Sequence, residues 1–173
     1  MVPSHSELTS RLEVDLSSHD GSGTTIPLVV ANMTAVAGRR MAETVSRRGG
    51  LVVLPQDIPL DVVQTVVDFV KSRHTIFETP ITMPGDGTVG EALSLIHKRA
   101  HGAVIVMDGD GRPAGIFTEH DATGFDRFSQ LHTSMSRELI SLSASQSAEE
   151  MFNQMTELRI TFAPVIDKDG RLV

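Results

Sequence analysis

The feature that most constrains this chain is an internal repeat in its second half. Residues 79–122 share most of their pattern with residues 138–173 when the two segments are aligned without a gap, at a constant offset of about 59 residues. A repeat of this length indicates a structural unit that occurs twice. The fold of the second half must therefore accommodate two similar units of helix and strand.

Each copy begins with a helix start signal. In the first copy Thr88 and Glu91 form the S/T-x-x-E pattern of a capping box, in which hydroxyl and carboxylate bind free amides of the first helical turn. Ser147 and Glu150 repeat the pattern in the second copy. Apolar residues follow at the i, i+3, i+4, i+7 spacing of one helix face. These residues are Val89, Ala92, Leu93 and Ile96, and then Ala148, Met151, Phe152 and Met155. We expect both apolar faces to be buried.

A short apolar run follows each helix, at 103–107 and at 162–166. Each run leads into an Asp-x-Asp-Gly-Arg sequence, whose glycine can adopt the positive φ of a hairpin turn. The first copy continues with a returning strand at 114–117 and the sequence Thr-Glu-His-Asp. The second copy stops at Val173, one residue before its counterpart to Gly115, so it lacks most of that strand and the motif.

This order of strand, capped helix, strand, turn, strand and T-x-x-D resembles the cystathionine-β-synthase (CBS) domain, which normally occurs as a tandem pair, the Bateman module. The resemblance implies β-α-β-β-α units, with a first CBS domain at 76–134 and an incomplete second one at 135–173. In that family the threonine and aspartate hold the ribose of an adenine or guanine nucleotide, which implies this role for Thr118 and Asp121. The alternative is that Thr118 caps the next helix and Asp121 belongs to its acidic first turn. The two interpretations are compatible.

The resemblance also implies contacts for the rest of the nucleotide. We expect the base to lie against Ile81 and Ile116, between the two copies. The phosphates would meet cations such as Lys98, Arg99 or Arg112. The alternative for these cations is an ordinary solvated surface, where most Lys and Arg side chains lie.

Two strand-helix units precede the repeat. The apolar run 26–33 predicts a strand covered on both faces, followed by a helix at 37–48 that ends at paired glycines. A second strand is expected at 51–54, and a second helix at 60–73 has valines at helical spacing. This order predicts parallel strands. Two strands alone cannot bury their faces, so we expect the segment 1–75 to be incomplete as an independent fold.

The N-terminal segment 1–25 is polar and rich in turn residues. Its apolar anchors are Leu8, Leu12, Val14 and Leu16. We expect an extended segment that lies over another surface.

The sequences IPLVVANMTAV and RRMAETVSRRGGLVVL, followed by a helix and the CBS pair, resemble the IMP dehydrogenase and GMP reductase family. In that family a (β/α)8 TIM barrel carries a CBS pair inserted after its second barrel helix. The resemblance implies an α/β chain in which 1–75 opens such a barrel. It also implies an NAD- or NADP-dependent purine-nucleotide oxidoreductase with Asn32 and Met33 near the substrate. Met33 can equally be a buried methionine at a strand end.

Several features depart from the family pattern. Thr34 stands where the family has an aspartate, and 54–57 differs from the common Leu-His-Arg-Asn type. Both substrates therefore stay open, although Asn32 and Met33 favour GMP reductase. The family's reaction forms a covalent adduct on a cysteine, and this chain has 0 cysteines. A complete barrel also needs about 250 residues, whereas this chain has 173. We expect no catalytic residue here, and a fragment, a truncated product or a degenerate copy of the enzyme.

Composition excludes several classes of function. The net charge is −7, with no basic arm, which argues against nucleic-acid binding by phosphate neutralisation. No apolar run has membrane-spanning length and no signal-peptide pattern is present, so we expect a cytoplasmic protein without a membrane partner. The histidines lack the spacing of a helical metal-binding pair, so no metal site is expected. We expect a homo-oligomer through the CBS pair or the barrel segment, and unpaired apolar faces in 1–75 favour self-association or capture of another protein partner.

The function favoured by the sequence is the regulatory, nucleotide-sensing end of a purine-nucleotide oxidoreductase. The first alternative is a stand-alone CBS-domain protein without enzyme activity, which binds adenine or guanine nucleotides or a partner and uses 1–75 as a docking arm. The second is a purely structural assembly module. Nucleotide affinity in an Asp121→Ala variant distinguishes the proposed site from these alternatives.

Overall fold

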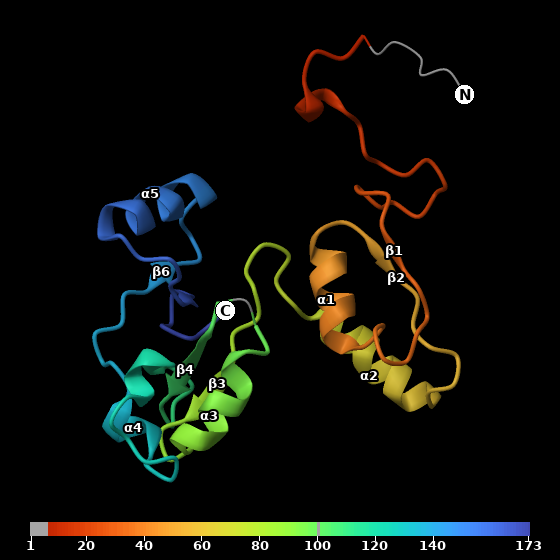
Figure 1. Ribbon diagram of the computed structural model, residues 1–173. Coiled ribbons are helices and arrows are strands. Elements are labelled where there is room, and N and C mark those ends of the chain that lie inside the picture. Colours follow the sequence, from red (N-terminus) through yellow and green to blue (C-terminus); the bar gives the residue numbers. More distant parts are fainter. Residues whose placement is uncertain (1–6, 100) are drawn as a thin grey trace. The chain divides into compact units, whose positions relative to one another are not determined.

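The computed structural model of this protein describes residues 7–99 and 101–173 (Figure 1). The chain divides into two compact units, Met1–Ile76 and Phe77–Val173. The part of the expected N-terminal segment at 1–6 lies outside the described residues. The boundary expected between the two copies of the repeat, between residues 134 and 135, stays a prediction.

Unit 1 contains two parallel strands and two helices. Its elements are a 3-10 turn at Arg11–Glu13, β1 (Val29–Val30), α1 (Arg39–Arg47), β2 (Leu51–Val52) and α2 (Leu60–Lys71). β1 pairs with β2 in parallel. α1 packs against both β2 and α2. The predicted order of strand, helix, strand and helix is confirmed, and so is the parallel pairing.

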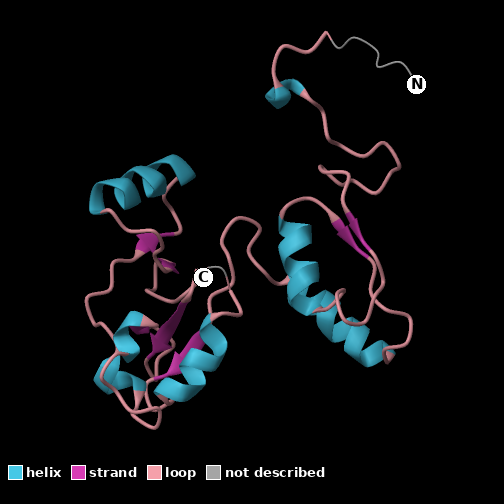
Figure 2. Ribbon diagram, in the orientation of Figure 1, coloured by secondary structure: helices cyan, strands magenta, loops and turns pink. Residues whose placement is uncertain are grey.

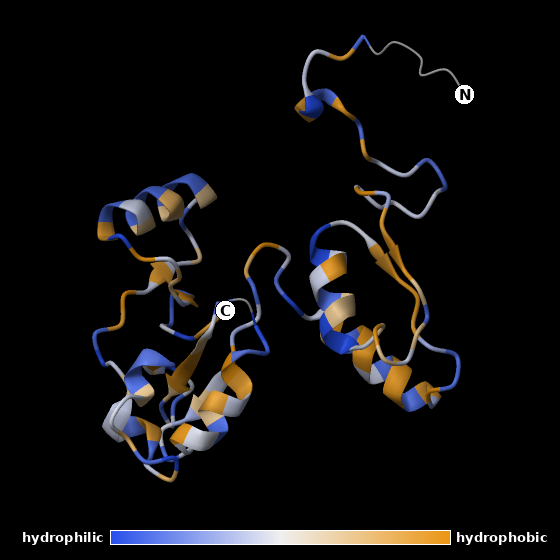
Figure 3. Ribbon diagram, in the orientation of Figure 1, coloured by the Kyte–Doolittle hydropathy of each residue, from blue (hydrophilic) through white to orange (hydrophobic). Residues whose placement is uncertain are grey.

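The strands of unit 1 are shorter and more exposed than predicted. Only two residues of the run 26–33 form a strand, and Val29 is 61% exposed. No residue of α2 is buried. Figure 3 shows hydrophobic residues along β1, β2 and α2. The prediction that helices cover both faces of the first strand is wrong for this chain, because a two-stranded sheet offers its helices too little surface to bury.

The apolar residues of the N-terminal segment are exposed side chains. Leu12 is 95% exposed. The other three anchors, Leu8, Val14 and Leu16, are between 43% and 50% exposed. None of these four side chains is buried, and the surface over which the segment is expected to lie stays a prediction.

Charged side chains hold α1 and α2. Glu43 is 2% exposed and accepts a hydrogen bond of 2.8 Å from Arg47, one turn further along α1. Phe69 of α2 lies between two guanidinium groups, with the Arg39 and Arg73 Cζ atoms 4.5 and 4.4 Å from the ring centroid. Cation–π contacts and a paired buried charge compensate here for a small apolar core.

Unit 2 contains the repeat (Figure 2). The first copy contributes β3 (Thr82–Pro84), α3 (Val89–Ile96), β4 (Ala103–Met107), β5 (Pro113–Thr118), a 3-10 turn at His120–Ala122 and α4 (Leu131–Ser134). The second contributes β6 (Leu142–Ser143), α5 (Ala148–Leu158) and β7 (Val165–Ile166). β4 lies between a parallel β3 and an antiparallel β5, while β6 and β7 pair in parallel. The predicted order of elements is confirmed in both copies as far as the chain extends.

The hairpin turns of the two copies have the same geometry. The Asp108 N–H donates to the Arg112 carbonyl at 2.9 Å, and the Asp167 N–H donates to the Arg171 carbonyl at 2.8 Å. The glycine before each arginine has φ of 78° and 76°, respectively, in the left-handed region. The second copy has a single antiparallel bridge in place of the returning strand.

Both predicted capping boxes are confirmed. The Thr88 hydroxyl accepts from the Glu91 N–H at 3.3 Å, and the Glu91 carboxylate accepts from the Thr88 N–H at 2.9 Å. Ser147 and Glu150 make the same two bonds at 3.2 and 2.7 Å. The bond from the backbone N–H of the cap residue, followed by the bond from its hydroxyl, lowers the pKa of each glutamate below its ordinary 4.5.

We expect the stabilisation by these carboxylates to be lost in acid. Folding lowers the pKa of such a carboxyl group below the 4.5 of the unfolded chain. The group therefore stabilises the fold at a pH above 4.5, and this stabilisation is lost as the pH falls through the lower pKa of the folded state. Glu91→Gln keeps a capping partner but does not titrate. Its thermal midpoint should therefore vary less than that of the wild type between about pH 5 and 3. Circular dichroism measures this, with the exposed Glu157→Gln as control; equal slopes for the wild type and Glu91→Gln would contradict the assignment.

The core of unit 2 belongs to the first copy. Seven buried residues form it: Met83, Val89, Ala92, Val104, Val106, Phe117 and Leu131. In the second copy Met151 is 7% exposed, but Phe152 is 69% exposed. The prediction that the second apolar face is buried is therefore wrong in part. The physical reason is that β6 and β7 have two residues each, which is too little sheet to cover a whole helix face.

Two kinds of feature are absent from residues 7–99 and 101–173. No helix in this part of the chain has the length and apolar character needed to cross a membrane. No three His, Cys, Asp or Glu side chains in it come together in a group that could hold a metal ion.

Candidate functional site

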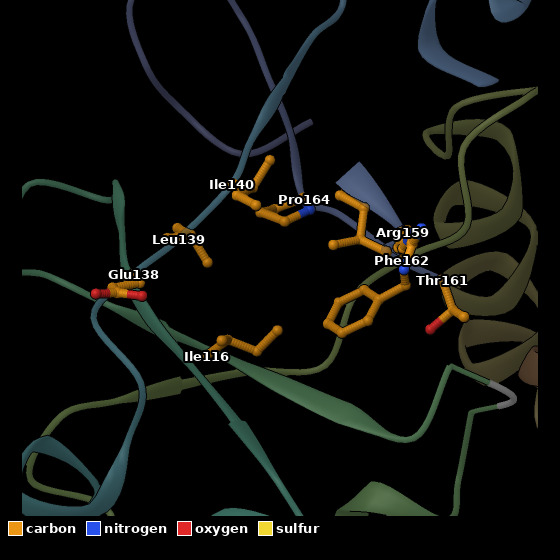
Figure 4. A pocket seen from close by; sticks show the side chains of 9 residues that line it. Ile116, Glu138, Leu139, Ile140, Arg159, Thr161, Phe162 and Pro164 are labelled. Carbon is orange, nitrogen blue, oxygen red and sulfur yellow. The ribbon is translucent and has the colours of Figure 1, made fainter. Parts of the chain in front are cut away.

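A cavity of about 330 Å³ lies in unit 2 between the first copy and the second (Figure 4). Its walls come from β5, from the segment before β6 and from the segment between α5 and β7. The lining residues are Ile116, Glu138, Leu139, Ile140, Arg159, Ile160, Thr161, Phe162 and Pro164. Figure 4 shows the Ile116, Leu139 and Phe162 side chains pointing into the cavity. Its volume is within the range of small-molecule sites, and its lining combines apolar side chains with polar ones, among them Glu138, Arg159 and Thr161.

A bridge between β5 and the segment after α4 shapes this cavity. Ile116 and Ser136 exchange two backbone hydrogen bonds, each of 2.9 Å. Gly115 permits the close approach, because a Cβ there would lie 2.6 Å from the Met135 sulfur and 2.7 Å from the Ser136 carbonyl oxygen. The bridge directs residues 138–140 along the cavity beside Ile116.

Thr118 and Asp121 come together at the end of β5. The backbone N–H and the hydroxyl of Thr118 both donate to Asp121 Oδ2, at 2.8 and 2.7 Å. Thr118 does not cap the following turn, whose N-cap residue is Glu119 and lacks a side-chain cap bond. Alternate residues of a strand point to the same face, so Thr118 shares a face of β5 with Ile116. Asp121 Oδ1 takes part in neither of the two bonds.

Arg159 gives the cavity a cation that the sequence did not predict. Its backbone has φ 53° and ψ 37°, the left-handed conformation in which glycine usually ends a helix. Among the described residues it is the one non-glycine with positive φ. Residue type gives no signal for this cation, because a left-handed position at a helix end is usually occupied by glycine. Glu138 is the other charged residue of the lining.

Of the residues predicted to bind the nucleotide, Ile116 lines this cavity, whereas Thr118, Asp121 and the remaining ones are not among its lining residues. Ile81 is half-buried and packs against the core of the first copy. Lys98 and Arg99 have partners of their own within the chain. Arg112 lies beside the second hairpin turn, where its Nε is 3.7 Å from the position of a Cβ on Gly170.

A second group of candidate residues lies at the carboxyl ends of β1 and β2 in unit 1. The Thr34 hydroxyl donates to the two carboxylate oxygens of Asp57 at 3.4 and 3.3 Å, which ties together the loops that follow the two strands. Asn32 and Met33 lie in the first of these loops, and Met33 is 59% exposed, not buried. Loops at the carboxyl ends of parallel strands are the usual place for binding residues.

The two units define an α/β chain in which a parallel strand-helix pair precedes a twice-occurring unit with a cavity between its copies. The chain belongs to the IMP dehydrogenase / GMP reductase family, whose domain pattern matches residues 1–170. This confirms the resemblance seen in the sequence.

Individual relatives agree with the family assignment. The chain is 48% identical to the GMP reductase of Mycobacterium tuberculosis, over 99% of this chain and 36% of the relative. It is 25% identical to the IMP dehydrogenase of Nitrosopumilus maritimus, over 98% of this chain and 36% of the relative. The structure of Trypanosoma brucei GMP reductase in complex with guanosine 5'-triphosphate matches with a TM-score of 0.66 and 25% identity, covering 99% of this chain and 43% of that chain. The chain thus spans about a third of the length of these curated relatives.

Proposed function

We propose that this chain is the nucleotide-sensing part of a GMP reductase type of purine-nucleotide oxidoreductase. Unit 1 opens the (β/α)8 barrel, and unit 2 is the CBS pair inserted into it. Identity to the mycobacterial GMP reductase is nearly twice that to the Nitrosopumilus IMP dehydrogenase, which supports the reductase. Matches to such enzymes along the whole chain give no support to a stand-alone CBS protein.

The cavity of unit 2 is the proposed binding site for a purine nucleotide. The observation that supports the proposal is the shared face of β5. Ile116 lines the cavity, and Thr118, which binds Asp121, lies two residues further along the same face, outside the lining itself. A carboxylate can accept from the vicinal hydroxyls of a ribose. Phe162 offers a ring for the base, and Arg159 offers a guanidinium for phosphate. The GTP present in the Trypanosoma structure supports a guanine nucleotide as the first ligand to test.

Binding regulates the parent enzyme only if the nucleotide has different affinities for two arrangements of the CBS pair. The proposed substrate region is the β1 and β2 loop edge with Asn32 and Met33, closed by the contact of Thr34 with Asp57. This chain has 0 cysteines, so we assign no catalytic residue to it. We assign the NAD(P) of the family to no residue of this chain. A homo-oligomer is expected through the CBS pair or through the exposed apolar faces of unit 1.

Asp121→Asn is expected to weaken the binding of GTP about tenfold, because the amide loses the charge of the carboxylate and one of its acceptors. Isothermal titration of the 173-residue chain with GTP and ATP measures this. Asp126→Asn is the matched control, because Asp126 also accepts a local backbone N–H, at 2.9 Å, but lies in an exposed turn.

The outcomes separate the parts of this proposal. Unchanged affinity in Asp121→Asn would place the ribose elsewhere. Failure of the wild type to bind either nucleotide would exclude nucleotide sensing by this chain and favour an assembly role for unit 2.

A further inference from the structure

A ring contact joins the two copies behind the cavity wall. His101 directly precedes β4 in the first copy, and its ring is stacked on Phe162 of the second copy, with centroids 5.9 Å apart and an interplanar angle of 20°. Phe162 lines the cavity, whereas His101 is not among the lining residues. His101 is therefore placed to act on the cavity through Phe162.

The imidazole of His101 is held in an unfavourable environment. Among residues 7–99 and 101–173 neither of its ring nitrogens, both buried, has a hydrogen-bond partner. Burial lowers the pKa of His101; Glu78 opposes this shift, Arg99 adds to it, and the Thr79 backbone also opposes it. A neutral imidazole has one donor and one acceptor, and leaving both unpaired in the interior destabilises this arrangement.

The repeat shows that this polar ring is particular to one copy. At the offset of about 59 residues His101 corresponds to Ile160, an apolar residue of the cavity lining. An apolar side chain is thus accommodated at the equivalent position, and packing alone does not require a histidine at 101.

We propose that His101 is a positioning residue that couples occupation of the cavity to the first copy of the repeat. The contact with His101 holds the Phe162 ring in one orientation. A purine base that stacks on Phe162 displaces this ring, and His101 then turns to reach hydrogen-bond partners. The hydrogen bonding of His101 therefore differs between the two arrangements, and so does their free energy. A ligand that binds one arrangement more tightly than the other shifts the equilibrium between them. This inference rests on the proposed function of the cavity.

His101→Leu tests the coupling, because leucine removes both nitrogens with a modest change in volume. We expect the melting temperature to rise by about 4 °C, since two unpaired buried groups are removed. We expect the Kd for GTP to rise about fivefold, since the arrangement without ligand is stabilised. A residue that only fills space would give a lower melting temperature and the wild-type Kd. His97→Leu, at an exposed position after α3, is the matched control and should change neither quantity.

A spectroscopic measurement on the wild type does not depend on the folding of a variant. The Cε1–H resonance of His101, identified by its absence from the His101→Leu spectrum or from selective labelling, is expected to shift when GTP saturates the protein. A resonance that does not move, or an unchanged Kd in His101→Leu with normal binding by the wild type, overturns the coupling and leaves the proposed function intact. Absence of GTP and ATP binding by the wild type overturns both.

Discussion

Phe117→Ala is expected to destabilise unit 2 by about 3–5 kcal/mol, the usual cost of truncating a buried phenylalanine. Phe117 is 0% exposed and packs within the cluster formed by β3, β4, α3 and α4. A loss of this size is a large share of the roughly 5–15 kcal/mol that stabilise a typical domain. Since Phe117 lies on β5 between Ile116 and Thr118, nucleotide binding should be lost together with the core. Urea unfolding followed by circular dichroism measures the change.

Phe152→Ala is the matched control for this prediction. It is the same substitution in the second copy, at a side chain that is 69% exposed on α5. Its effect is expected to stay within about 0.5 kcal/mol, as for other surface substitutions. Comparable destabilisation by the two variants would show that α5 buries its apolar face in solution and that the core is not confined to the first copy.

Features that depend on near neighbours in the sequence were predicted from it. The capping pair Thr88 and Glu91 has both partners within one helical turn, and the turn at 108–112 is closed by its own aspartate and glycine. Thr118 and Asp121 also form a local pair, and their two hydrogen bonds lie within four residues. In these cases residue type and spacing determine the geometry.

Burial was predicted less well, because it depends on surfaces supplied by distant parts of the chain. Periodicity identifies the apolar face of a helix but not the sheet that covers it. Ala92 and Met151 are buried at equivalent positions, whereas Phe152 is exposed where its counterpart Leu93 is partly buried. The first copy has three strands and the second has two, and this difference decides which side chains are covered.

The candidate site shows the same limit. Ile81 was predicted to contact the base, but the residue that lines the cavity is Ile140, its equivalent in the second copy. The packing of one copy against the other decides which of these two equivalent residues lines the cavity, and the repeat alone does not give this packing. Arg159 could not be assigned from residue type, because its location follows from a left-handed backbone that usually requires glycine.

Phe162→Ala is expected to weaken the binding of GTP and of ATP about 30-fold each. Stacking of a base on an aromatic ring contributes about 1–3 kcal/mol, and about 2 kcal/mol corresponds to this factor. Both nucleotides should lose affinity to the same extent, because every purine has a face for stacking. Phe162 is half-buried, so the fold should persist. Isothermal titration measures the loss, with Phe125→Ala, a 43% exposed phenylalanine outside the cavity lining, as control.

The combination of Phe162→Ala with Asp121→Asn tests whether the two side chains hold different parts of one ligand. If Phe162 contacts the base and Asp121 the ribose, their effects on the free energy of binding should add within about 0.5 kcal/mol. If neither single variant binds more weakly than the wild type, the cavity is not the nucleotide site. A loss in Asp121→Asn alone would keep the ribose at the T-x-x-D turn but move the base away from Phe162, and His101 would then have no route to the ligand.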